Sequence, residues 1–220
     1  MTPQEYDAWY DSPRGRWIGN VELELLCRHL DTSPGKGLLD VGCGTGWFTR
    51  RLAAAGLDVT GVDVDASALR FARARSDDDI CYVEGDACRL PFADQSFDQV
   101  ISVTALCFVD DWHRAIAEIA RVTKRRFVLG LLNRHSLLWL EKGRSGGKGA
   151  YKGAHWHTRR ELDEVRKELP VERLHFSSAI FLPSGTEFPK AVERVLPNGL
   201  PWGAFLVVSG DVERKGAFEN

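Results

Sequence analysis

The residues with the clearest chemical meaning are three alternating glycines and a carboxylate that follows them. Gly42, Gly44 and Gly46 come directly after an apolar run at 38–41, and Asp63 follows Gly42 by 21 residues at the end of a second apolar run. Glycine lets a chain turn sharply and lets a ligand approach the backbone closely. A helix that leaves such a turn offers unpaired N–H groups, and a carboxylate at a strand end can accept hydrogen bonds from ribose hydroxyls. This spacing predicts a site for a ligand that contains a nucleoside.

The same residues argue against a dinucleotide. The dinucleotide fingerprint is G-x-G-x-x-G/A, and Trp47 stands here at its third glycine position. An indole fits poorly where a helix must pack closely on a strand and a pyrophosphate must sit. The carboxylate of Asp40, just before the turn, suits a cationic ligand better than a diphosphate. The predicted ligand is therefore a nucleoside that carries positive charge, and a nicotinamide-dependent oxidoreductase is the rival interpretation.

Strands and helices that could position this turn alternate through residue 132. Five strands are expected, at 38–41, 58–63, 80–83, 99–103 and 127–132. Helices are expected at 46–55, from a cap at Asp65 to about Arg75, and from a cap at Asp111 through Val122. This alternation predicts a parallel sheet with helices on both faces.

The pattern changes at both ends of this region. The first thirty residues are expected to be helical, and residues 143–153, with five glycines, are expected to form a mobile loop. Thr158 and Glu161 have capping-box spacing, which predicts a helix over 158–169. Two late strands, at 171–181 and 204–210 with a Pro/Gly-rich connection, predict an antiparallel hairpin at one sheet edge.

Three motifs in this order resemble those of class I S-adenosylmethionine-dependent methyltransferases, in the small-molecule type 11 branch. They are LLDVGCGTGWFT, GVDVDASAL and EGDACRLPFADQSFDQVISV, and the resemblance extends over residues 38–122. It implies an α/β fold with a Rossmann-like seven-stranded sheet, six strands parallel and one antiparallel in a final hairpin. The chain departs from the family at 122–127, where VTKRRF replaces a common Pro-Gly-Gly turn and makes a basic surface patch.

The resemblance also implies S-adenosylmethionine as cofactor, S-adenosylhomocysteine as its product, and a role for each matching residue. Asp40 would help hold the amino end, Asp63 the ribose hydroxyls and Asp86 the adenine amino group. Val64 would touch the adenine, beside a backbone N–H from Ala87. The full set implied to contact the cofactor is Asp40, Gly42, Cys43, Gly44, Gly46, Asp63, Val64, Asp86, Ala87 and Thr104.

The catalytic group is the least determined part of the site. An acceptor hydroxyl usually needs a base such as His or a carboxylate, whereas a neutral amine needs little help. The residues chosen are His155, His157 and Tyr10, from a set that also contains His113, His135 and Tyr6. His155 and His157 would share one face of an extended segment, but no third ligand accompanies them and no metal site is predicted.

The whole chain, 1–220, is interpreted as one methyltransferase domain in three parts. Residues 1–33 form an N-terminal helical lid, 34–135 the cofactor-binding core, and 136–220 the substrate-side loop, helix and terminal strands. In the lid, Tyr6, Trp9 and Tyr10 would either cover the sulfonium, since aromatic faces attract cations, or pin the helix to the domain surface.

The amino-acid composition limits which partners and which cellular compartment are expected. The net charge is −2, so no basic excess favours nucleic acid or a membrane surface. No apolar run approaches the roughly 18 residues of a membrane span, and the N-terminus does not resemble a signal peptide. Five cysteines without a CxxC spacing argue against a disulfide framework or a zinc knuckle. A cytoplasmic monomer or homodimer is expected.

These observations predict an enzyme that transfers a methyl group from S-adenosylmethionine to a small-molecule acceptor by in-line displacement. The nucleophile would be nitrogen or oxygen. Residues 103–118 resemble a bacterial and archaeal subgroup suggested to act on histamine-like amines, which makes an amine one candidate acceptor. The alternative is a regulatory or accessory protein that binds S-adenosylmethionine without transferring its methyl group.

Overall fold

One seven-stranded sheet lies at the centre of the structure, a computed structural model that describes residues 2–77 and 79–213. Met1 and residues 214–220, at the ends of the predicted 1–220 domain, lie outside the described residues. The strands are β1 (Gly37–Val41), β2 (Asp58–Asp63), β3 (Cys81–Glu84), β4 (Phe97–Val103), β5 (Thr123–Leu132), β6 (Val171–Ala179) and β7 (Phe205–Val212). Their order across the sheet is β3-β2-β1-β4-β5-β7-β6.

The direction of the strands confirms the expected fold. β1 to β5 pair in parallel, and β7 runs antiparallel between β5 and β6. Since β6 is antiparallel to β7, it runs with the other five, which gives six strands in one direction and one reversed. The strand order changes direction between β1 and β4, and in such sheets ligands bind in the crevice outside the carboxyl ends at this switch point.

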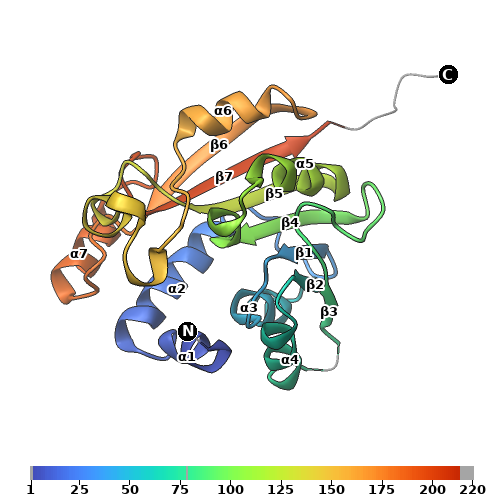
Figure 1. Ribbon diagram of the computed structural model, residues 1–220, viewed down its shortest axis with the longest axis horizontal. Helices are drawn as coiled ribbons and strands as arrows, with labels where there is room; N and C mark the ends of the chain where they lie inside the picture. Colours follow the sequence, from blue (N-terminus) through green and yellow to red (C-terminus); the bar gives the residue numbers. More distant parts are fainter. Residues whose placement is uncertain (1, 78, 214–220) are drawn as a thin grey trace.

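Helices cover both faces of the sheet, as Figure 1 shows. On one face lie α2 (Pro13–Cys27), α3 (Trp47–Ala54) and α4 (Ala66–Ala74), with α1 (Pro3–Trp9) packed against α4. On the other face lie α5 (Trp112–Val122) and α6 (Arg159–Arg166). The predicted caps are confirmed: Asp65 caps α4, Asp111 caps α5, and Thr158 with Glu161 forms the capping box of α6.

The connections differ most from expectation. The stretch between β6 and β7 contains a helix that was not predicted, α7 (Glu187–Val195). Residues 143–153, expected to be a mobile loop, carry short helical turns: η2 (Trp139–Gly143), η3 (Arg144–Gly146) and η4 (Gly149–Tyr151). At the departure from the family pattern, α5 ends at Val122 and β5 begins at Thr123, with no residue between them.

The core explains why the central strands are apolar runs without alternation. Leu38, Leu39, Val100, Ile101 and Val128 are fully buried because helices cover both faces of their strands. In the part of the chain that the structure describes, no helix combines the length and the apolar character needed to cross a membrane.

Candidate active site

The glycine turn after β1 is held over the end of β2. The backbone N–H groups of Gly42 and Cys43 both donate to the carbonyl of Val62, at 2.7 and 3.1 Å. Gly42, Gly44 and Gly46 have φ angles of 74°, 53° and 75°, in the left-handed region that favours glycine. The turn therefore presents bare backbone at the carboxyl edge of the sheet, where a ligand can approach closely.

Asp63, the last residue of β2, is fixed beside this turn by two backbone donors. Its Oδ2 accepts the N–H of Gly44 at 2.7 Å, and its Oδ1 accepts the N–H of Asp65 at 2.8 Å. The side chain is only half-buried, so its remaining lone pairs face outward. A carboxylate held in this way can accept two neighbouring hydroxyl groups.

Asp40 is the buried carboxyl of the site. It is 2% exposed and accepts a hydrogen bond from the Thr49 hydroxyl at 2.7 Å. Burial raises the pKa of Asp40 to about 7, the Thr49 hydrogen bond opposes the rise, and the charge of Asp63 adds to it. A carboxyl with this pKa ionises readily when a positive charge comes near, which suits a cationic ligand.

The remaining predicted contacts lie at the ends of β2, β3 and β4. Val64 is 73% exposed, Asp86 is exposed and accepts the N–H of Cys88 at 2.8 Å, and Ala87 is half-buried. Thr104 follows β4 with a φ of 57°, and its N–H donates to the carbonyl of Gly130 at 2.7 Å. All the predicted cofactor residues thus lie at the carboxyl ends of four neighbouring parallel strands.

His155 and His157 lie against α5. The His157 ring meets the Trp112 ring edge-on at 4.8 Å and the His155 ring at 4.5 Å. His157 is 0% exposed, and neither ring nitrogen has a hydrogen-bond partner among the described residues. Burial lowers the pKa of His157 to about 3, with smaller contributions from His155 and His113. The ring is therefore neutral and enclosed.

Tyr10 lies on the other face of the sheet from the two histidines. Its ring stacks on Trp47 at 4.2 Å, and its hydroxyl is 3.4 Å from that of Tyr6. Burial raises the pKa of Tyr10, and the charges of Tyr6 and Glu22 raise it further. The three residues chosen as catalytic from the sequence thus fall into two groups, one beside α5 and one between α1 and α3.

The N-terminal segment is fastened to the glycine turn by a buried ion pair. The carboxylate of Asp7, which is 5% exposed, accepts from Arg50 at 2.9 Å and lies 3.3 Å from Arg75. Arg50 also donates to the carbonyl of Thr45, in the turn, at 2.6 Å. These contacts of Arg50 therefore fix α1 beside the glycine turn.

Glu22 is a buried carboxyl that was not predicted from the sequence. It lies on α2, is 8% exposed, and has no hydrogen-bond or ion-pair partner among the described residues. The signal was present: Ile18, Gly19, Leu25 and Leu26 line the buried face of the helix, and Glu22 occurs on that same face, at the spacing of one helical turn. Because burial of an unpaired carboxyl is unfavourable, a carboxylate on an apolar helix face points to a function.

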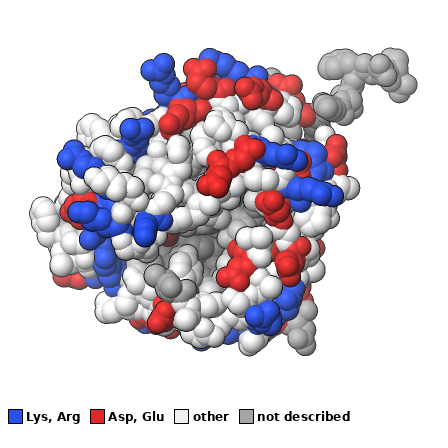
Figure 2. All heavy atoms as spheres, in the orientation of Figure 1, with Lys and Arg blue, Asp and Glu red and all other residues white. Residues whose placement is uncertain are grey.

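A hollow opens near the middle of the face shown in Figure 2, beside the tip of β4 in Figure 1. Acidic side chains lie to its right, and Lys and Arg side chains gather to its left, over η2 to η4. The exposed basic residues of that segment are Lys142, Arg144 and Lys148. The two sides of the hollow therefore carry opposite charge.

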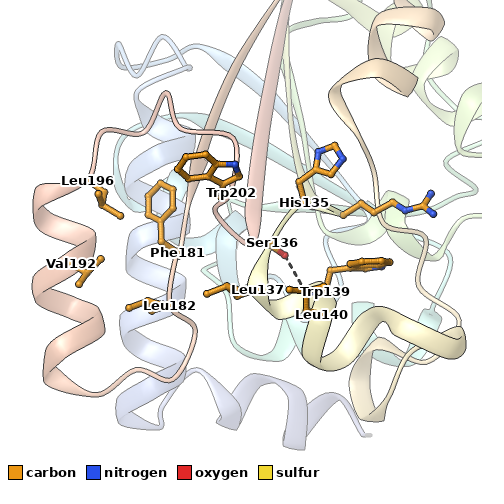
Figure 3. Close-up of a pocket in the computed structure, with 11 residues that line it drawn as sticks. His135, Ser136, Leu137, Trp139, Leu140, Phe181, Leu182, Val192, Leu196 and Trp202 are labelled. Carbon is orange, nitrogen blue, oxygen red and sulfur yellow. Dashed lines mark hydrogen bonds between the residues drawn. The ribbon is translucent and has the colours of Figure 1, made fainter.

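A second cavity, of about 690 Å³, lies between α7 and residues 134–140. Figure 3 shows that mainly apolar side chains from four stretches of the chain face it. They include Leu137, Trp139, Leu140, Phe181, Leu182, Val192, Leu196 and Trp202. The described residues contain no group of three or more His, Cys, Asp or Glu side chains placed to share a metal ion.

Comparisons with known proteins agree with this geometry. Residues 39–129 match the type 11 methyltransferase family, described as a methyltransferase domain. A malonyl-[acyl-carrier protein] O-methyltransferase of Erwinia pyrifoliae is 39% identical over 138 residues, which are 57% of this chain and 52% of that protein. A demethylmenaquinone methyltransferase of Renibacterium salmoninarum is 44% identical over 91 residues, 41% of this chain and 38% of that protein. The chain thus spans about half or less of the length of these relatives.

A solved structure covers nearly the whole chain. It is a SAM-dependent methyltransferase from Thermotoga maritima, described as a possible histamine N-methyltransferase. The two chains superpose with a TM-score of 0.77 at 27% identity, over 96% of each.

The strand order, the glycine turn and the carboxylates beside it are those of a class I methyltransferase that uses S-adenosylmethionine as cofactor. Within this class, residues 39–129 resemble the type 11 methyltransferase family, whose model they match.

Proposed function

We propose that the protein transfers a methyl group from S-adenosylmethionine to a small-molecule acceptor, with an amine nitrogen as the nucleophile. The observation that carries the proposal is the grouping at one sheet edge. A bare glycine turn, the Asp63 carboxylate bound to the N–H of Gly44, and the buried Asp40 carboxyl all lie at the carboxyl ends of β1 and β2. This set fits a cationic nucleoside better than a diphosphate.

In the proposed arrangement each strand end has one task. Asp63 holds the ribose hydroxyls, Asp40 the charge at the amino end, and Asp86 the adenine amino group. The turn Gly42, Cys43, Gly44 and Gly46 lines the methionine and ribose portions, with Val64, Ala87 and Thr104 as further contacts. The left-handed φ of the three glycines supports close approach of the ligand to the backbone.

When bound, S-adenosylmethionine supplies a methyl group on a sulfonium, already activated for displacement. The protein's main task is then alignment of the nucleophile with the methyl carbon, which can contribute on the order of 7–11 kcal/mol of the barrier. The Asp7–Arg50 ion pair supports this role for the N-terminal segment, because it holds Tyr6 and Tyr10 close to the turn.

The names of similar proteins bear on the identity of the acceptor. The two curated relatives are named for different acceptors, malonyl-[acyl-carrier protein] and demethylmenaquinone. The Thermotoga maritima neighbour, which matches over nearly the whole chain, is described as a possible histamine N-methyltransferase. Its description supports an amine acceptor here. A cytoplasmic location, a monomeric or homodimeric state and the absence of nucleic-acid partners stay predictions from the sequence.

Ligand-induced stabilisation tests the cofactor site. A ligand at about 100 times its dissociation constant adds about 2.7 kcal/mol to the free energy of unfolding. We expect S-adenosylmethionine and S-adenosylhomocysteine to raise the melting temperature and NAD to leave it unchanged. Asp63→Ala should abolish the rise because it removes the ribose acceptor.

The matched control is Asp58→Ala. Asp58 begins the same strand at the opposite edge of the sheet and is exposed, so this variant should respond to both ligands as the unmodified protein does. A full response from Asp63→Ala would show that the ribose is held elsewhere, and a response to NAD would favour the oxidoreductase.

A screen with labelled donor against amines, phenols and thiols tests the transfer itself. Label transferred to an amine supports the proposal. Tight binding of the donor with transfer to no acceptor would instead favour the accessory protein that binds S-adenosylmethionine without using it.

A further inference from the structure

The carboxyl of Glu22 lies among side chains that do not neutralise it. It is enclosed by the helix face that packs on β5, β6 and β7. Its oxygens are not among the fully enclosed side-chain atoms that lack a partner in the described chain. The carboxyl is therefore buried, and among the described residues it holds its position without a hydrogen bond or ion pair.

Three phenol rings lie close enough to this carboxyl for its charge to act on them. The charge of Glu22 contributes to the raised pKa of Tyr6, Tyr10 and Tyr151, in each case after the larger effect of burial or of a nearer tyrosine. Tyr6 and Tyr10 come from the N-terminal segment and Tyr151 from η4, so the three rings approach from two sides. One turn of α2 before Glu22, Gly19 lies against both Tyr10 and Trp47, which places this part of the helix next to the stacked rings.

Tyr6 is influenced both by Glu22 and by carboxylates of the proposed cofactor site. Its pKa is also raised by the charges of Asp40 and Asp63, which lie at the ends of β1 and β2. Although 39% of the residue is exposed, its hydroxyl reaches that of Tyr10 at 3.4 Å. Tyr6 is thus near enough to Glu22 and to both carboxylates proposed to hold the donor for all three charges to act on it.

We propose that Glu22 and the rings of Tyr6, Tyr10 and Tyr151 form the acceptor site, which binds an ammonium group and takes one proton from it before methyl transfer. This inference rests on the proposed function. A carboxylate surrounded by aromatic rings is a recognised combination for cations, because the ring faces and the charge both attract them. A neutral alcohol or thiol gains neither interaction.

The proton has a defined path in this site. The Glu22 carboxylate takes one proton from the bound ammonium ion, which frees the nitrogen lone pair. That lone pair forms the new N–C bond while the C–S bond of the donor breaks, and the electron pair of the broken bond stays on sulfur. The proton then leaves Glu22 for water, and the methylated product departs as an ammonium ion.

The pH dependence follows from the same burial. Burial raises the pKa of Glu22 to about 8, and no charged neighbour contributes to that shift. The titratable groups nearest to it are the three tyrosines, with Arg14 beside Tyr151 and with Asp40 and Asp63 beyond Tyr6. For an amine acceptor, kcat/KM should therefore rise with pH through about 8 and fall where the amine itself loses its proton.

The experiment compares Glu22→Gln with Glu24→Gln, the same change two residues along α2 on an exposed side chain. The acceptors are histamine, tyramine, 2-phenylethylamine and ethanolamine, with 2-phenylethanol as a neutral match. We expect at least one amine to be methylated. In Glu22→Gln at pH 8.5, catalytic efficiency toward that amine should fall by a factor of about 100 or more, and the rising limb near pH 8 should disappear. Glu24→Gln should stay within twofold of the unmodified protein.

Calorimetric titration separates this inference from the proposed function. In the complex with S-adenosylhomocysteine, Glu22→Gln should bind the amine at least tenfold more weakly, while its affinity for S-adenosylhomocysteine stays within twofold. If only phenols or thiols are methylated, or if Glu22→Gln keeps its rate and pH profile, the assignment of Glu22 is wrong although the protein is still a methyltransferase.

If no acceptor is methylated, the proposed function fails, and the binding titration decides the site by itself. Amine binding that depends on Glu22 would support the ammonium site. Absence of amine binding, or equal binding by both variants, would overturn it.

Discussion

The proposed cofactor side and the proposed acceptor side are built in different ways. The proposed cofactor side is made by backbone and by strand ends that follow one another closely along the chain, from Asp40 to Thr104. The proposed acceptor side combines side chains that lie far apart in the sequence, such as Tyr6, Glu22 and Tyr151. On the first side, the shape is set by turns and hydrogen bonds of the main chain. On the second side, it is set by which helices pack together.

This difference predicts where related proteins should diverge. Residues 39–129, which match a methyltransferase family model, contain the proposed cofactor side, and two relatives of the chain are named for unlike acceptors. A side made of backbone tolerates few changes, since each glycine and each strand-end carboxylate has a fixed geometry. A side made of packed side chains can change one residue at a time, and that is where specificity can diverge.

The largest predicted effect tests whether the stability of the cofactor side depends on the backbone conformation of its glycines and the space beside them. A Cβ on Gly42 would overlap Ala105, whereas one on Gly44 would meet nothing within 4 Å. Both glycines have positive φ. Gly42→Ala should therefore lose about 2–5 kcal/mol of stability from strain and crowding, and Gly44→Ala only about 1–2 kcal/mol from strain.

Chemical denaturation measures both variants, and titration with S-adenosylhomocysteine measures the site. Equal losses in the two variants would mean that backbone conformation, and not the space beside Ala105, controls this turn.

The second prediction concerns the residues beside α5, where His157 is buried and neutral. Its folded pKa of about 3 lies below the unfolded value of 6.5, so its contribution to stability is complete above pH 6.5 and is lost as pH falls toward 3. The loss is about 1.4 kcal/mol per pH unit in that interval. His157→Leu should remove this part of the slope when unfolding is followed by denaturant titration between pH 7 and pH 4.

His135→Leu, a change at an exposed histidine, provides the comparison. If the acid sensitivity of His157→Leu equals that of the unmodified protein, His157 is charged in the folded state, and the catalytic role expected from the sequence regains support.

The smallest predicted effect is on the cofactor side, at Asp40. Its pKa of about 7 should fall when a cationic ligand binds, so affinity for S-adenosylmethionine should rise with pH. Between pH 6 and pH 8 the gain should be about tenfold, or about 1.4 kcal/mol. Calorimetry in buffers of different ionisation enthalpy measures the released proton, and Asp40→Asn should release none. A proton released equally by that variant would come from another group.

Most of the fold and half of the site could be predicted from the sequence because local signals determine them. The glycines at 42, 44 and 46, and the caps at Asp65 and Asp111, act within a few residues of their own position. The helix α7 was missed because its segment contains Pro189 and is flanked by turn residues, which argue against a helix. Pro189 lies in the first turn of α7, where proline is tolerated.

Glu22 was missed for a different physical reason. Its place on the apolar face of α2 can be predicted from local spacing, but the nearby rings come from distant segments, which no window of sequence contains. The cavity beside α7 has the same origin, since its lining comes from residues 134–140, from the segment after β6, from α7 and from the approach to β7.

The guanidinium group of Arg50 fastens the N-terminal helix to the glycine turn. One of its nitrogens donates to the carbonyl of Thr45, and another donates to the carboxylate of Asp7. The N-terminal helix therefore cannot move away from the glycine turn without breaking these interactions.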